Sequence, residues 1–145
     1  MNSSATTSAV VMLAGAITIG WIVGGGAFAD EKKEVYKPTT GVRTLLETPL
    51  PGVEGRQITV LHGTFPAGWT GGKHYHTGPV YVYVLEGDFT IDEVGKPRRT
   101  IRAGELYEEP IGTPMQARNV SASQPVKVLV FQVHGLREPL AYKAE

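Results

Sequence analysis

The stretch Gly68-Trp69-Thr70-Gly71-Gly72-Lys73-His74-Tyr75-His76 carries two histidines one residue apart, directly after a glycine-rich bend. In an extended strand, side chains two residues apart project from the same face, so His74 and His76 are predicted to point the same way. Two imidazoles on one face can hold one metal ion. The stretch therefore predicts a strand that carries at least half of a metal site.

The chain on both sides of this stretch has the pattern of short strands separated by turns. Its 145 residues include 18 glycines and 10 prolines, and such heavy use of turn-forming residues favours many short strands over long helices. Residues 39–55 contain Pro49 and Pro51 and are predicted to be irregular. The other predicted strands span residues 57–65, 80–85, 88–94, 98–102, 105–109, 115–120 and 126–133. The expected fold class is all-β, as an antiparallel barrel or sandwich.

Composition narrows the classes of function. A hydrophobic content of 41% with 19% charged residues supports one packed domain rather than a disordered chain. The 14 basic and 14 acidic residues balance, so no nucleic-acid partner is expected. The chain has no cysteine, which excludes disulfides, thiolate metal ligands and cysteine nucleophiles.

The first 29 residues differ from the rest because they contain no charged side chain. The mostly apolar residues 9–23 are followed by three glycines and Ala27-Phe28-Ala29, a pattern typical of a signal peptide cleaved after Ala29. The alternative is an uncleaved N-terminal anchor, which would be the chain's only contact with a membrane. Both alternatives predict an exported, periplasmic or extracellular protein. The predicted organisation is a signal or anchor at 1–29, a linker and edge segment at 30–55, a barrel at 56–134 and a polar tail at 135–145.

Two motifs within the predicted barrel resemble those of the cupin superfamily. The first motif consists of Gly68, five residues, His74, one residue, His76 and, later, Gly87. The second consists of Gly104, five residues, Pro110-Ile111-Gly112, two residues, Met115, three residues and Asn119. The resemblance covers residues 57–133 and implies a small jelly-roll (cupin-type) β-barrel. In that family a metal ion is held inside the barrel by three histidines and a glutamate.

The sequence departs from the family pattern at two ligand positions. The family glutamate falls on Val80, and the third histidine falls on Met115. Only His74 and His76 carry over as ligands, and two neutral imidazoles alone would hold a divalent ion weakly. The full cupin metal site therefore cannot be transferred to this chain by resemblance.

Three ways of completing the site remain open. Glu108 or Glu109 could face inward by strand alternation and form a set of two histidines and one carboxylate, which suits Fe, Mn, Zn or Ni. Met115 could itself be a ligand, and a His-His-Met set suits Cu. In the third alternative nothing completes the site, and the pocket stays a metal-free or weakly occupied cavity that Val80 and Met115 make more apolar.

These alternatives define the functional hypotheses. The main one is an exported cupin that binds a divalent metal, a small molecule or both through His74 and His76, with catalysis undecided. The others are a metal-dependent oxygenase, isomerase or lyase acting on a small organic molecule, and a metal-free ligand-binding cupin.

Four further side chains receive structural predictions. Tyr81 and Tyr83 alternate with inward-facing valines, so they are expected on the outer face of the sheet, where they would pack or form a homodimer interface. His62 and His134 are expected to be hydrogen-bonded structural residues rather than metal ligands.

Overall fold

The computed structural model describes residues 32–38 and 41–145, so the predicted signal segment at 1–29 lies outside the described residues. The described residues form one compact unit from Lys32 to Glu145. That part of the chain has no helix that could cross a membrane. Its strands are β1 (Val42–Pro49), β2 (Arg56–Phe65), β3 (His74–Tyr75), β4 (Val80–Glu86), β5 (Asp88–Glu93), β6 (Arg99–Arg102), β7 (Leu106–Glu109), β8 (Met115–Arg118), β9 (Val126–Gly135) and β10 (Tyr142–Lys143).

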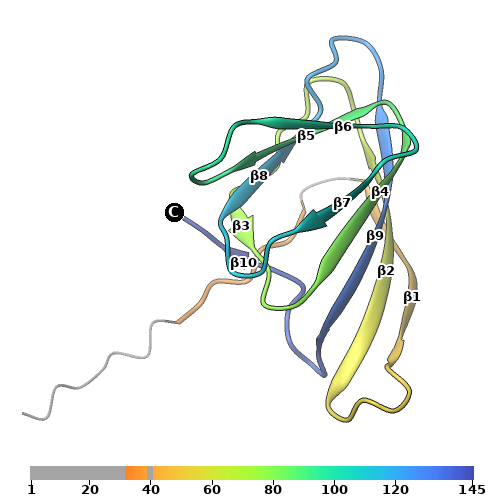
Figure 1. Cartoon of the computed structure of the whole chain (residues 1–145), viewed down its shortest axis with the longest axis vertical. Helices are drawn as coiled ribbons and strands as arrows, with labels where there is room; N and C mark the ends of the chain where they lie inside the picture. The colour runs from red at the N-terminus through yellow and green to blue at the C-terminus, as the bar shows by residue number, and fades with distance from the viewer. Residues whose placement is uncertain (1–31, 39–40) are drawn as a thin grey trace, which may run out of the picture. The chain divides into compact units, whose positions relative to one another are not determined.

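The strands build two five-stranded antiparallel sheets that face each other (Figure 1). The first sheet has the order β1-β2-β9-β4-β7, and the second has the order β10-β3-β8-β5-β6. The consecutive strands β5 and β6 pair directly with each other. The predicted all-β class is confirmed, and the arrangement of the two sheets fits a jelly roll. The histidine strand β3 belongs to the second sheet, and β7 forms one edge of the first.

Strict alternation along β4 separates the core from the outer surface. Val80, Val82 and Val84 are buried, whereas Tyr81 and Tyr83 are each 37% exposed. Because successive side chains of a strand point to opposite faces, the valines enter the barrel and the tyrosines leave it. The predicted outward direction of these two tyrosines is confirmed.

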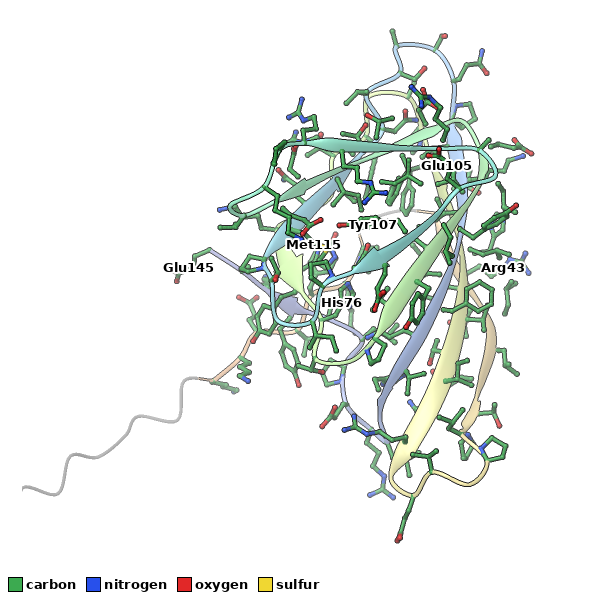
Figure 2. All side chains as sticks on the ribbon, in the orientation of Figure 1. Arg43, His76, Glu105, Tyr107, Met115 and Glu145 are labelled. Atoms are coloured by element: carbon green, nitrogen blue, oxygen red, sulfur yellow. The ribbon has the colours of Figure 1, made fainter. Side chains whose placement is uncertain are left out.

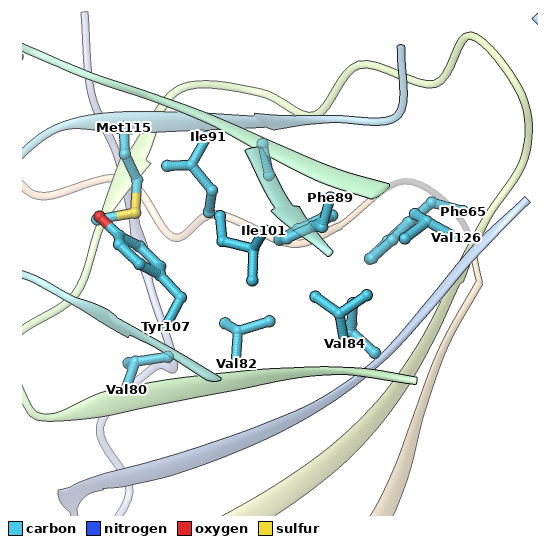
Figure 3. Packing of buried hydrophobic residues seen from close by; sticks show 12 residues of the cluster. Phe65, Val80, Val82, Val84, Phe89, Ile91, Ile101, Tyr107, Met115 and Val126 are labelled. Carbon is cyan, nitrogen blue, oxygen red and sulfur yellow. The ribbon is translucent and has the colours of Figure 1, made fainter. Parts of the chain in front are cut away.

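The hydrophobic core fills the space between the two sheets (Figure 3). Tyr107 and Met115 lie at one end of this cluster, and Phe65 and Val126 lie at the other (Figure 3). Burial of each such side chain contributes about 1.5–3 kcal/mol. Residues from both sheets take part, so the barrel is held together by packing across its interior.

The prediction of an irregular segment at 39–55 is wrong for residues 42–49, which form β1. This strand pairs with β2 from Val42 opposite Gly63 to Pro49 opposite Gln57. It forms the edge of its sheet, and seven of its eight residues are exposed. An edge strand tolerates proline and lacks the inward apolar pattern that reveals inner strands, which explains why the sequence did not predict it.

Both ends of the described chain lie against the histidine strand. The C-terminal strand β10 pairs with β3, and Val35 forms an isolated bridge with Tyr142. The backbone N–H of Tyr36 donates to the carbonyl of Ala141 at 3.0 Å. The segment at 32–38 and the tail therefore add to the second sheet beside the two histidines.

Candidate metal centre

His74, His76 and Glu109 converge inside the barrel. Each of them is buried, and one potential ligand atom from each lies within 4.8 Å of the others. The Nε2 atom of His76 is 3.0 Å from a carboxylate oxygen of Glu109. The turn that follows β7 also contacts the residue after β3, because Gly112 N–H donates to the His76 carbonyl at 2.8 Å. Figure 2 shows His76 and Met115 at this end of the barrel.

The sheet register explains why Glu109 reaches the histidines. Glu109 of β7 lies directly opposite Val80 of β4, the position at which the cupin motif has its glutamate. Opposite residues of an antiparallel pair share a face, so the carboxylate enters the barrel from the strand beside its usual place. Glu108 is exposed. Of the two glutamates left open by the sequence, the structure therefore directs Glu109 inward and Glu108 outward.

Backbone carbonyls orient both imidazole rings. His74 Nδ1 donates to the Gly72 carbonyl at 2.9 Å, and His76 Nδ1 donates to the Leu140 carbonyl at 2.8 Å. The buried amide of Gln132 donates to the same Leu140 oxygen. Because both Nδ1 atoms carry a proton for these carbonyls, Nε2 is the atom of each ring that is available to a metal ion, which is the usual arrangement of metal-ligating histidines.

The two histidines differ in their electrostatics. Burial lowers the pKa of His74, and the hydrogen bond to Gly72 offsets this only in part. Burial also opposes protonation of His76, but the hydrogen bond and negative charge of Glu109 outweigh it and raise the pKa of His76 above 6.5. A metal ion that binds at His76 Nε2 would therefore compete with a proton there.

This competition predicts a pH dependence of metal binding. Below the folded-state pKa of His76, the apparent Zn²⁺ affinity should rise about tenfold per pH unit, and it should level off above that pKa. A competition titration against a chromophoric chelator between pH 5 and 9 measures this. A Zn²⁺ affinity that does not change across the acidic half of that range would show that the metal ion does not compete with a proton at His76.

The contribution of His76 to the stability of the metal-free protein should have the opposite pH dependence. A raised histidine pKa stabilises the folded state fully below pH 6.5, and this contribution is lost as the pH rises through the folded pKa.

Met115 lies next to the site in the sheet but serves the core. It is opposite His74 in the register between β3 and β8, is 1% exposed and belongs to the hydrophobic cluster. A cavity of about 90 Å³ is lined by His74, His76 and Glu109 but not by Met115. The Glu109 carboxylate therefore shares this cavity with the two histidines, whereas the Met115 thioether does not line it.

The rest of this cavity is largely apolar. Its walls come from both sheets and include Phe65, Val82, Phe89 and Val128. The three polar side chains thus face a hydrophobic chamber inside the barrel. A ligand bound beside them would be surrounded mainly by hydrocarbon, as is usual in small-molecule sites.

Sequence reasoning missed the residues that cover the site. The Tyr36 ring stacks on the His74 ring with centroids 4.3 Å apart, and its hydroxyl accepts a hydrogen bond from Gly72 N–H. Tyr36 and Leu140 lie in segments predicted to be a linker and a polar tail. No local pattern could have revealed them, since their contacts depend on strand pairing between distant parts of the chain.

The two remaining histidines stay outside the site. His134 is 2% exposed, and its ring contacts the Thr59 hydroxyl at 2.8 Å and the Glu138 carbonyl at 3.2 Å. The prediction that it is a hydrogen-bonded structural residue is confirmed. His62 lies in the middle of β2, away from the cavity lining.

Comparison with known proteins supports the same family. Residues 61–132, about half of the chain, match the model of the Cupin domain family (Cupin_2). No curated protein matches the sequence.

Several solved structures share the fold at low sequence identity. A double-stranded β-helix protein from Klebsiella pneumoniae has a TM-score of 0.53 and 19% identity, covering 75% of this chain and 86% of its own. A cupin-like protein from Thermotoga maritima has a TM-score of 0.52 and 20% identity, covering 72% and 86%. The DMSP lyase DddQ from Ruegeria pomeroyi has a TM-score of 0.50 and 20% identity over 68% of this chain.

This chain spans about half (49%) of the length of that lyase, and such identities establish the fold rather than the activity. The spacing of the two sequence motifs, the two facing sheets and the family match all agree. The chain is a member of the cupin superfamily.

Proposed function

We propose that this protein is a cupin that binds one divalent metal ion through His74, His76 and Glu109, together with a small organic molecule in the adjoining cavity. The observation that carries the proposal is the convergence of three buried ligand atoms within 4.8 Å. A buried carboxylate with two imidazoles is costly unless the charges are compensated, and a metal ion compensates them. This donor set suits Fe(II), Mn(II), Zn(II) or Ni(II).

The same geometry supports a metal-dependent enzyme as the second candidate. Three protein ligands leave coordination positions open for a substrate, whose oxygen a metal ion would polarise. The classes that fit are an oxygenase, an isomerase or a lyase, and the lyase DddQ shares the fold. A metal-free ligand-binding protein is the third candidate, favoured by the apolar cavity walls.

The identity of the bound metal tests how the site is completed. With Glu109 as the third ligand, Met115→Leu should keep the metal stoichiometry of the wild type, because leucine preserves the volume of a core residue. Elemental analysis of both purified proteins measures this. If the wild type contains copper and Met115→Leu does not, the metal is held by the His-His-Met set and not by the set with the carboxylate.

We also propose that the protein is exported and that residues 1–29 are removed. The apolar stretch that ends in Ala27-Phe28-Ala29 supports this. Intact mass of the protein purified from its native host should give a chain that begins at Asp30. A mass that includes residues 1–29 would favour the membrane anchor.

A further inference from the structure

The candidate metal ligands have little contact with solvent. His74, His76 and Glu109 are 8%, 7% and 6% exposed, and all three line the inner cavity of about 90 Å³. Access to them is therefore narrow, and movement of part of the cavity wall would widen it.

Tyr36 forms a part of this wall that also borders the surface. A surface cleft of about 460 Å³ shares two lining residues with the inner cavity, Tyr36 and Leu140. The Tyr36 ring lies parallel to the His74 ring, with an angle of 2° between their planes. Tyr36 is itself only partly buried. Its ring therefore separates the surface cleft from a candidate metal ligand.

The segment that carries Tyr36, residues 33–36, is called the strap here. It is joined to β10 through the bridge between Val35 and Tyr142, which two backbone hydrogen bonds of 3.0 and 2.8 Å flank. Glu34 and Lys143 also form an ion pair, and both side chains are more than half exposed. A segment held by a few exposed interactions opens at a lower free-energy cost than the strands of the core do.

The glycine-rich bend leaves room for the Tyr36 ring in the closed position. A Cβ atom added at Gly72 would lie only 2.9 Å from Cε2 of Tyr36. The N–H of Gly72 also donates to the Tyr36 hydroxyl at 3.2 Å. The bend and the ring fit each other, so the strap closes in one specific position.

We propose that the strap is the gate of the metal centre: its bridge to β10 breaks, and Tyr36 moves off His74 to admit a metal ion or a small ligand. This inference rests on the proposed function, because both occupants belong to the inner cavity. Glu109 also lines a second surface cleft, of about 520 Å³. That wall belongs to β7, which four residue pairs join to β4, so the strap is the part that opens more easily.

A disulfide across the bridge would hold the strap closed. The chain has no cysteine, so Val35→Cys/Tyr142→Cys can form only this disulfide within one chain. The two positions lie between the flanking hydrogen bonds. Such a pair has Cα atoms about 4.5 Å apart, within the range that a disulfide needs. The matched control without a crosslink is Val35→Ser/Tyr142→Ser.

The crosslink should slow the release of metal. The oxidised full-length protein, loaded with Zn²⁺, should lose the ion to an excess of chromophoric chelator about tenfold or more slowly than the serine control, because local opening is suppressed.

Tyr36→Ala removes the wall and leaves the bridge in place. Its Zn²⁺ association and dissociation rates, measured by stopped flow, should both rise about tenfold or more above those of the wild type, since binding no longer waits for an opening step. Tyr83→Ala, on the outer face of β4, should change neither rate. A residue that only held His74 in place would change the dissociation rate alone.

Equal release from the crosslinked protein and its control, or an unchanged association rate in Tyr36→Ala, overturns the gate. Absence of bound Zn²⁺ from the wild type would instead refute the proposed function. The gate is then measured without metal, by the rate at which diethyl pyrocarbonate modifies His74 and His76, followed by mass spectrometry. Slower modification of the crosslinked protein than of its serine control supports the gate, and equal rates overturn it.

Discussion

Replacing Glu109 with glutamine is expected to lower the affinity for Zn²⁺ by roughly 100-fold or more. This loss is larger than the one expected when a residue that only orients a metal ligand is replaced. The amide has nearly the same shape as the carboxylate but carries no charge, and it is a much poorer ligand for these metals. The affinity is measured by competition with a chelator at constant pH. The same variant should lower the pKa of His76, because the hydrogen bond and charge that raise it are lost while burial remains.

Glu108→Gln is the matched control for this experiment. It makes the same chemical change one residue away, on a side chain that is exposed on the outer face of β7. Its Zn²⁺ affinity should equal that of the wild type. Equal affinities of Glu109→Gln and Glu108→Gln would show that the buried carboxylate is not a ligand.

Asn119→Ala is expected to destabilise the fold by about 2–4 kcal/mol, since several buried hydrogen bonds are lost together. Asn119 is 2% exposed. Its amide group donates to the carbonyls of Phe65, Pro66 and Gln124 at 2.8–3.1 Å. Its side-chain oxygen accepts from Ser121 N–H at 3.1 Å. Urea denaturation of the metal-free protein measures the loss.

The exposed Ser123 in the same turn offers a control, and Ser123→Ala should change stability by no more than about 0.5 kcal/mol. Asn119 ties the end of β2 to the turn before β9, and its backbone N–H also holds the Trp69 carbonyl. If Asn119→Ala were as stable as Ser123→Ala, this anchoring role would be wrong.

The fold could be predicted because its turns leave local signals. Gly68, Gly87, Gly104 and Gly112 of the two motifs all have positive φ, between 71° and 86°. Residues with side chains rarely adopt this conformation. The spacing of these glycines therefore records where the chain turns, and the strands lie between them.

The candidate site could be predicted only in part. The two-residue period of a strand placed His74 and His76 on one face. Within the carboxylate alternative, strand alternation allowed either Glu108 or Glu109 to face inward, and the choice depends on the pairing of Val80 with Glu109. This register is a property of the assembled sheet. Tyr36 reaches His74 through similar long-range pairing, which leaves no trace in the local sequence.

The metal content of the purified protein shows whether His74 and His76 bind a metal ion. The wild-type protein and the His74→Ala/His76→Ala double variant are purified in parallel, incubated with Zn²⁺, dialysed and submitted to elemental analysis. We expect about one metal ion per wild-type chain, because there is one cluster of three ligands, and none in the double variant. Equal metal content in the two proteins would contradict it.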